Sequence, residues 1–227
     1  MGGNGESAGF LAVAVAGTAA VLLAARAARR SLAARVRCRL ACECGRVRGA
    51  LCALPEDVKP VLCFCRSCRE YARWLATRPP GAPGARCCMC VVRPDTATSL
   101  VMCSKADVSL EQGLEWVQVC AKDATSETRR FFARCCNTPL FTTGESLGWL
   151  AVPAACLDDS AAKFGEPKLS FIEFAEKPVA AQGRELLALS ETAWFALRNA
   201  PYAGAGPKLD YGGAPKLYWG GTAAKAT

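Results

Sequence analysis

Three cysteines within six residues, at Cys63, Cys65 and Cys68, are the residues of this sequence whose type and spacing best suit chemistry. A turn of this kind can present three sulfurs to a single ion, with a fourth coordination position left for water or a substrate. Three protein ligands and an open position are typical of catalytic zinc, whereas structural zinc sites are closed by four ligands. The spacing therefore predicts a metal centre at Cys63, Cys65 and Cys68 that can act on a bound ligand.

Two further cysteine clusters lie on either side of this group along the chain. Cys42 and Cys44 form a Cys-x-Cys pair, and Gly45 after them allows the tight backbone turn that a metal-binding knuckle needs. Cys135 and Cys136 form the third cluster, far along the chain. A metal held between these two clusters would close a long loop, and a structural zinc can contribute on the order of 10 kcal/mol to folding.

The composition limits which metals these clusters can hold. The 227 residues include 15 cysteines and no histidine, which excludes Ser-His-Asp and Cys-His mechanisms and any histidine-ligated metal. Thiolate-rich sites favour zinc or an iron–sulfur cluster. A chain of this length can build a core without disulfides, so we expect a reducing compartment. Cysteines outside the clusters, such as Cys103, Cys120 and Cys156, are expected to be buried packing residues.

The N-terminal segment, residues 1–35, contains an uncharged apolar run over residues 8–25 that is just long enough to span a bilayer. Arginines follow this run directly, so the positive-inside rule places the rest of the chain on the cytosolic side of a single-pass membrane protein. The Arg-rich, Ala-rich, acid-free stretch that follows suits an alternative, a transit segment for a mitochondrion or plastid. A buried Ala-rich helix is the third possibility.

The net charge of +8 comes mostly from this same region of the chain. Eight arginines stand against one acid, Glu43, between residues 26 and 48: Arg26, Arg29, Arg30, Arg35, Arg37, Arg39, Arg46 and Arg48. The remainder is close to neutral, so the charge does not predict a face that binds nucleic acid.

Short apolar and alternating stretches predict a mainly β domain over residues 36–178. We expect strands near 36–40, 58–65, 114–121, 128–133, 148–152 and 169–174, and a short helix after a capping box formed by Ser67 and Glu70. Residues 179–227 form an extension, with an amphipathic helix predicted over 184–199 that carries Trp194 and Leu197 on its apolar face. Beyond it lies a tandem near-repeat, residues 207–213 and 215–221, which is either a partly ordered tail or a peptide that docks its aromatic residues on a protein partner.

In its order of motifs the chain resembles the glutathione-dependent formaldehyde-activating enzyme (GFA) family, which also includes centromere protein V. The resemblance runs from about Val36 to Pro178 and is nearest to a divergent, uncharacterised branch. Its markers are Cys-x-Cys-Gly at 42–45, Cys-x-Cys-x-x-Cys-Arg at 63–69, Arg-Phe-Phe at 130–132 before a Cys…Thr-Pro-Leu turn, and Val-Pro-Ala at 152–154 leading to Leu-Asp-Asp at 157–159.

This resemblance implies small β-sheets pinned by zinc, in a β-tent arrangement, with one structural and one catalytic zinc. The structural zinc would be held by Cys42, Cys44 and Cys136. The family's first cysteine of the later pair falls on Ala133 here, and Cys135 is the nearest replacement. The catalytic zinc would be held by Cys63, Cys65 and Cys68. The family's histidine inside this cluster is Phe64 here, and the glycine after the last zinc cysteine is Asn137.

Two functions are hypotheses at this point. The first is a zinc-dependent carbon–sulfur lyase-like enzyme that binds a thiol such as glutathione and makes or splits its adduct with an aldehyde. Arg66, Arg69 or Arg73 could then bind a substrate carboxylate, although a surface role is the simpler interpretation of each. The second is a non-catalytic, membrane-tethered zinc module for protein interaction. A fourth ligand to the three-cysteine site from water or substrate favours the enzyme, and one from Glu70 or a distant cysteine such as Cys87 or Cys90 favours the module.

Overall fold

The computed structural model describes residues 35–81, 97–144, 146–167, 169–171, 193–204 and 217–218. Apart from Arg35, all of these belong to one compact unit, Val36–Thr227. The predicted anchor or transit segment and the cysteines at 87, 88 and 90 lie outside the described residues. Within the described ranges, no helix is both long enough and apolar enough to cross a membrane.

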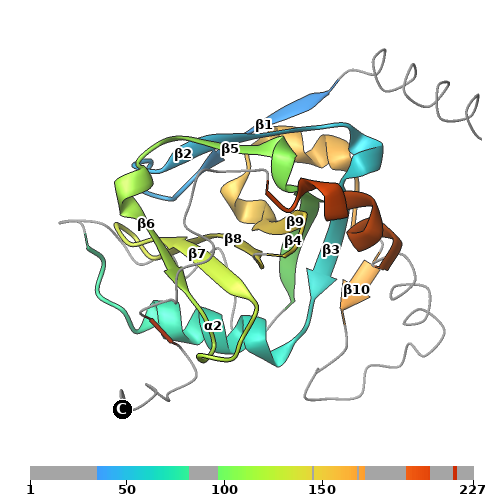
Figure 1. Cartoon of the computed structure of the whole chain (residues 1–227). Helices are drawn as coiled ribbons and strands as arrows, with labels where there is room; N and C mark the ends of the chain where they lie inside the picture. The colour runs from blue at the N-terminus through green and yellow to red at the C-terminus, as the bar shows by residue number, and fades with distance from the viewer. Residues whose placement is uncertain are drawn as a thin grey trace, which may run out of the picture. The chain divides into compact units, whose positions relative to one another are not determined.

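Two β-sheets form the body of this unit, and the expectation of a mainly β fold is confirmed (Figure 1). The smaller, fully antiparallel sheet has the order β1–β2–β5, from strands Val36–Ala41, Arg48–Ala53 and Val108–Gln112. The larger sheet has seven strands in the order β10–β3–β4–β9–β8–β7–β6 and is antiparallel except between β10 and β3. Its strands are Lys59–Cys63 (β3), Thr98–Ser104 (β4), Val117–Cys120 (β6), Arg129–Ala133 (β7), Thr138–Thr143 (β8), Trp149–Pro153 (β9) and Leu169–Phe171 (β10).

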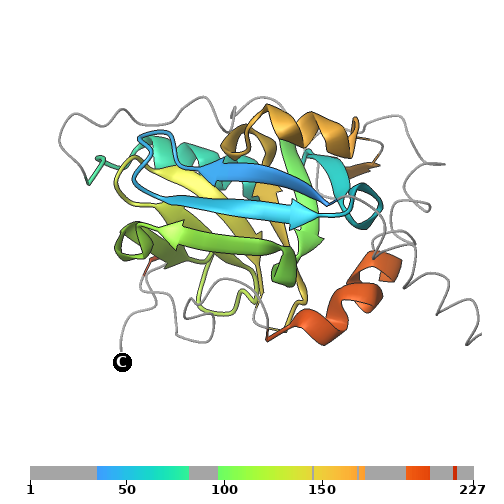
Figure 2. The same ribbon diagram turned by 90° about the horizontal axis from the view of Figure 1, so that it is seen from above.

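The main core lies between the two sheets, and Figure 2 shows the strands of the smaller sheet lying over the larger one. Because side chains alternate across a strand, every second residue of each strand points into this core. The buried residues include Cys38, Leu40, Leu51, Val101, Cys103, Leu150 and Val152. Phe131 and Phe141 stack within it, with ring centroids 4.7 Å apart.

Helical segments cover the outer face of the larger sheet. Helix α2 (Arg66–Ala76) packs Tyr71 and Leu75 on Cys120 and Phe132 of β6 and β7. At the other end of this face, the helical residues 193–199 place Phe195 on a second cluster formed by Val61, Met102 and Ala151. The 3₁₀ segments are Pro55–Asp57, Lys105–Asp107, Leu114–Trp116, Ala154–Cys156, Asp159–Phe164 and Ala200–Tyr202.

Helix α2 begins two residues earlier than the capping-box pattern predicts. Its N-cap is Cys65, whose Sγ accepts a hydrogen bond from the backbone N–H of Cys68 at 3.4 Å. Glu70 pairs with Arg66 at 2.6 Å, one turn before it, and does not return to the backbone of Ser67. The prediction that Ser67 caps the helix is therefore wrong, because the cysteine turn itself starts the helix.

The C-terminal helical segment differs from its predicted amphipathic pattern. Trp194 and Leu197, expected on the apolar face, are 59% and 67% exposed, whereas Phe195 is 2% exposed. The face of the helix that is buried is the one with Phe195 and Asn199. Phe195 packs on the larger sheet, and the backbone of Asn199 lies against Gly148. Residues 184–192 of the predicted helix lie outside the described residues.

Two contacts fix this segment to the 3₁₀ segments Pro55–Asp57 and Lys105–Asp107. Arg198 forms an ion pair with Asp57 at 3.1 Å. Lys105, whose side chain is fully buried, donates from Nζ to the backbone oxygens of Gly144 at 2.8 Å and Ala203 at 3.2 Å. A buried ammonium needs such partners, because leaving its charge without hydrogen bonds would cost several kcal/mol.

The predicted strands 36–40, 128–133 and 148–152 agree with β1, β7 and β9 to within a residue, and β3 ends two residues before the predicted end at 65. Strands β2, β4, β5 and β8 are not among the predicted ones, and the stretch 114–121 differs. Residues 114–116 form a 3₁₀ turn, and β6 starts only at Val117. The cause is Gly113, which has a φ of +75° and lies so close to Arg46 that a Cβ atom would be 2.2 Å from its carbonyl oxygen. Of the predicted strand 169–174, residues 172–174 lie outside the described part.

Candidate metal centres and the adjoining cavity

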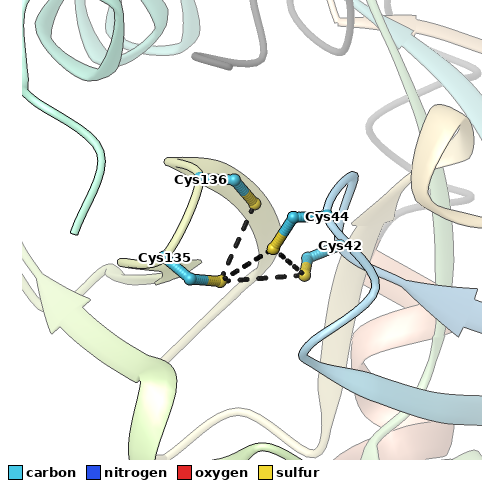
Figure 3. A group of neighbouring side chains, drawn as sticks. All are labelled: Cys42, Cys44, Cys135 and Cys136. Atoms are coloured by element: carbon cyan, nitrogen blue, oxygen red, sulfur yellow. Dashed lines mark hydrogen bonds between the residues drawn. The ribbon is translucent and has the colours of Figure 1, made fainter. Parts of the chain in front are cut away.

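Four cysteines from two distant turns meet at the edge between the sheets (Figure 3). Cys42 and Cys44 lie in the turn between β1 and β2, and Cys135 and Cys136 lie in the turn between β7 and β8. Sulfur–sulfur distances are 3.6 Å for Cys42–Cys44, 3.9 Å for Cys42–Cys135, 3.3 Å for Cys44–Cys135 and 3.8 Å for Cys135–Cys136. The structure thus brings together the two clusters that the sequence placed 91 residues apart, and it includes Cys135.

The backbone of both turns explains this convergence. Gly45 has a φ of +73° and Asn137 a φ of +58°, so each turn reverses through a left-handed residue just after its cysteines. The Cys42 Sγ accepts a hydrogen bond from the backbone N–H of Val47 at 3.2 Å. Thr138 links the turns, because its hydroxyl accepts from the N–H of Glu43 at 3.1 Å and lies 3.0 Å from the Cys136 Sγ.

The four-cysteine group fits a tetrahedral zinc ion. With Zn–S bonds of about 2.3 Å, two thiolates on one tetrahedral zinc lie about 3.8 Å apart. No disulfide joins the four cysteines, and three of the separations given above, 3.6, 3.9 and 3.8 Å, lie close to this value, whereas Cys44 and Cys135 are closer, at 3.3 Å. Hydrogen bonding by the Cys42 thiol lowers the pKa of Cys136 to about 4, which favours the thiolate form that a metal requires.

The second group consists of Cys63, Cys65 and Cys68, where the end of β3 runs into helix α2. The Cys63 Sγ lies 3.2 Å from that of Cys65 and 3.5 Å from that of Cys68. Within the described ranges no carboxylate and no fourth cysteine joins them. The donor set is again soft thiol sulfur at zinc-like spacing, but it supplies three ligands rather than four.

A buried arginine lies directly beside this three-cysteine group. Arg130 on β7 is 6% exposed, and its guanidinium donates to the Cys68 Sγ at 3.5 Å and to the Ser67 Oγ at 2.9 Å. Its other side stacks on Tyr71, with 4.9 Å from the guanidinium carbon to the ring centroid. Hydrogen bonds from Cys63 and Cys65 lower the pKa of Cys68, and the Arg130 charge adds to this. In this group Cys68 is therefore the sulfur that holds negative charge, whereas hydrogen bonding with its neighbours raises the pKa of Cys63.

A cavity of about 220 Å³ opens onto the same three cysteines. It lies against the outer face of the larger sheet, with Tyr71 of α2 and Arg130 of β7 in its lining. Its apolar lining residues are Leu100, Met102, Pro139, Phe141, Ala151 and Pro153. A ligand in this cavity would be next to the thiols, with apolar side chains covering part of its surface.

No family model matches this chain, and no curated protein matches it. Among solved structures, the chain is similar to a crystal structure of a Rhodobacter sphaeroides protein, a structural genomics target, with 16% sequence identity and a TM-score of 0.35. The match covers 58% of this chain and 98% of that one. Similarity at this level carries no argument about function, so any function for this chain has to be argued from the geometry of its site.

The other predicted site residues have simpler roles. Arg66 is paired with Glu70 on the surface of α2, which also removes Glu70 from the candidates for a fourth ligand. Burial raises the pKa of Cys38 to about 11 and that of Cys120 to about 12, and it also raises that of Cys103. These three thiols therefore stay protonated and act as packing residues, as the sequence predicts for Cys103 and Cys120.

Sequence reasoning missed the residues that surround the three thiols. Arg130 was noted as part of a motif but not as a neighbour of Cys68, which is 62 residues away. Thr98 and Trp149 carried no signal at all, yet both line the cavity. No local pattern could have found them, because strand pairing and the position of α2 bring them to the site.

Proposed function

We propose that this protein is a zinc-dependent, carbon–sulfur lyase-like enzyme that acts on the adduct of a thiol with an aldehyde. The observation that carries this proposal is the cavity that opens on a group of three thiols, beside a buried arginine. A closed structural site needs neither an incomplete ligand set nor a cavity. We further propose that the chain is a divergent member of the GFA family, on the order and spacing of its cysteine motifs.

Each group in the site has a part in this reaction. Cys63, Cys65 and Cys68 would hold the zinc, which when bound supplies a Lewis acid that favours the thiolate form of a substrate thiol. Arg130 would add positive charge on the Cys68 side and so stabilise sulfur anions in the site. The apolar side chains of the cavity wall would displace part of the surrounding water, which strengthens both interactions.

The proposed reaction is balanced without a further reactant. In the adduct, a carbon carries both the thioether sulfur and a hydroxyl group. The carbon–sulfur bond breaks with its electron pair moving to sulfur, the C–O bond becomes a carbonyl, and the hydroxyl proton leaves with the product thiol. The products are one thiol and one aldehyde, and the reverse direction joins them.

The four-cysteine group would hold a second, structural zinc, because it offers a complete set of thiolates and lies away from the cavity. It would connect the turn between β1 and β2 to the turn between β7 and β8, and hence the smaller sheet to the larger one. We also propose that residues 1–35 tether the domain to a membrane.

X-ray absorption at the zinc edge tests the proposed function. Before addition of a thiol, we expect an average below four sulfurs per zinc across the two sites, and a gain in sulfur coordination after addition. The Cys65→Ser variant, which keeps the four-cysteine site, should show no such gain. Complete sulfur coordination from the start would contradict the proposal and support the membrane-tethered, non-catalytic interaction module.

A further inference from the structure

Two residues that line the cavity each carry a buried polar atom with no hydrogen-bond partner among the described residues. The two atoms are the hydroxyl oxygen of Thr98 and the indole Nε1 of Trp149. Buried polar groups in folded proteins nearly always have partners, since an unsatisfied one costs about 1–3 kcal/mol. Two such atoms on residues that line one cavity, beside a candidate metal centre, point to a ligand that supplies the missing hydrogen bonds.

Strand pairing places these two residues at opposite ends of the cavity floor. Thr98 pairs with Cys63 across β3 and β4, so it lies at the end that holds the thiols. Trp149 pairs with Ser104 at the other end of β4. Six residues of extended strand separate Thr98 from Ser104, a rise of about 20 Å. The length of the tryptophan side chain shortens the distance between Thr98 and the indole ring. The order along the sheet remains the cysteine thiols, Thr98, the middle residues of β4, and then Trp149.

The middle section of the floor is apolar. It is formed by Leu100 and Met102 on β4, paired with Pro153 and Ala151 on β9. Among the described lining residues other than the cysteines, Arg130 is the only one with a charged side chain, and it is held at the thiol end by Cys68 and Ser67.

From this order we infer the substrate class: the thiol half of the adduct is an uncharged, extended apolar thiol with a hydrogen-bond acceptor at its far end. This inference rests on the proposed function and specifies its substrate. In the bound adduct, the ligand's sulfur and hydroxyl group lie between the cysteine thiols and Thr98. Its apolar hydrocarbon chain lies over Leu100 and Met102, and the acceptor at its far end accepts a hydrogen bond from the indole N–H of Trp149.

The same order disfavours glutathione, the thiol that the family resemblance suggests. Glutathione carries two carboxylates and an ammonium group. Because Arg130 is the only charged side chain among the described lining residues besides the cysteines, and lies at the sulfur end, a glutathione bound within the cavity would leave at least two charges without partners. Transfer of an unpaired charge out of water is far costlier than the loss of an apolar contact.

A series of thiols tests this inference on the full-length protein loaded with Co²⁺, whose sulfur charge-transfer absorption reports a new thiolate ligand. Ethanethiol, butanethiol and hexanethiol should bind about fourfold more tightly for each added methylene. 6-Mercaptohexanoate has the same six carbons as hexanethiol, with a carboxylate in place of the terminal methyl group. We expect 6-mercaptohexanoate and glutathione each to bind at least tenfold more weakly than hexanethiol.

A second comparison tests the role of Trp149. The uncharged ketone 6-mercaptohexan-2-one should bind about fivefold more tightly than hexanethiol, because its carbonyl accepts the indole N–H. Trp149→Phe should remove this difference and leave the affinity for hexanethiol nearly unchanged. Trp116→Phe is the matched control, since Trp116 lies outside the cavity beside Arg46 and Arg134. Thr98→Val should weaken binding of the formaldehyde adduct of hexanethiol but not that of the free thiol.

The outcomes separate the two proposals. Glutathione or 6-mercaptohexanoate binding as tightly as hexanethiol would overturn the inferred substrate class and leave the proposed function standing. If no thiol changes the Co²⁺ spectrum, the proposed function fails, and the substrate class fails with it.

Discussion

At the scale of single residues, Cys65 has two roles that can be separated by substitution. Its sulfur belongs to the three-cysteine group, and the same sulfur caps helix α2 by accepting the N–H of Cys68. We expect Cys65→Ser and Cys65→Ala each to lower the zinc content from two to one per chain. Serine keeps an acceptor at the N-cap, so the alanine variant should be less stable than the serine variant by about 1 kcal/mol.

Metal analysis and urea unfolding of both Cys65 variants provide the measurement. Equal stability of the two variants would show that the sulfur does not cap the helix in solution. Retention of two zincs in either variant would remove Cys65 from the ligand set, whatever its effect on the helix.

At the scale of elements, the attachment of residues 193–204 to the larger sheet depends on Gly148. A Cβ atom at this position would lie 1.6 Å from the backbone oxygen of Asn199. Gly148→Ala should therefore displace this segment and expose Phe195, with a loss of about 1.5–3 kcal/mol of burial energy. Limited proteolysis should show new cleavage between residues 193 and 204.

Gly204→Ala is the matched control for this prediction, because nothing lies within 4 Å of a Cβ atom at that position. We expect it to match the wild type in melting temperature and in proteolysis. If Gly148→Ala behaves in the same way, the segment does not pack on the sheet as described.

At the scale of the whole molecule, the four-cysteine group should decide whether the two sheets stay together. Cys42→Ser combined with Cys44→Ser removes two of its four thiolates. A structural zinc contributes on the order of 10 kcal/mol, which is comparable to the entire stability of a domain. We therefore expect the double variant to be unfolded at room temperature by circular dichroism, and the wild type to unfold when a strong chelator is added.

The half-buried Cys52, which lies on β2 outside both groups, offers a control for the loss of a thiol. Cys52→Ser should shift the melting temperature little. An unchanged melting temperature in the double variant at Cys42 and Cys44 would contradict a structural metal at this position.

The N-terminal segment should determine where the whole protein is found. We expect the full-length protein to sediment with membranes, and deletion of residues 1–34 to release a metal-loaded domain into the supernatant, because the apolar run 8–25 is removed. A full-length protein that stays in the supernatant with an intact N-terminus would contradict the anchor. A mature start near residues 30–36, detected by mass spectrometry, would support the transit segment.

The sequence by itself determined the features that depend on local spacing. Cys63, Cys65 and Cys68 meet because a turn of six residues cannot separate them far, and Gly45 marks the left-handed turn after Cys42 and Cys44. The mainly β character followed from alternating apolar residues, since a strand buries every second side chain.

Only the tertiary structure decided which distant residues share a site. The pairing of β3 with β4 places Thr98 beside Cys63, β7 carries Arg130 to Cys68, and the β7–β8 turn brings Cys135 as well as Cys136 to Cys42. The helix at 193–199 buries Phe195 rather than Trp194 and Leu197, because the close approach of Asn199 to Gly148 turns the Phe195 side of the helix toward the sheet. Such contacts depend on strand order and packing across the whole chain, and the spacing of residues within one segment does not encode them.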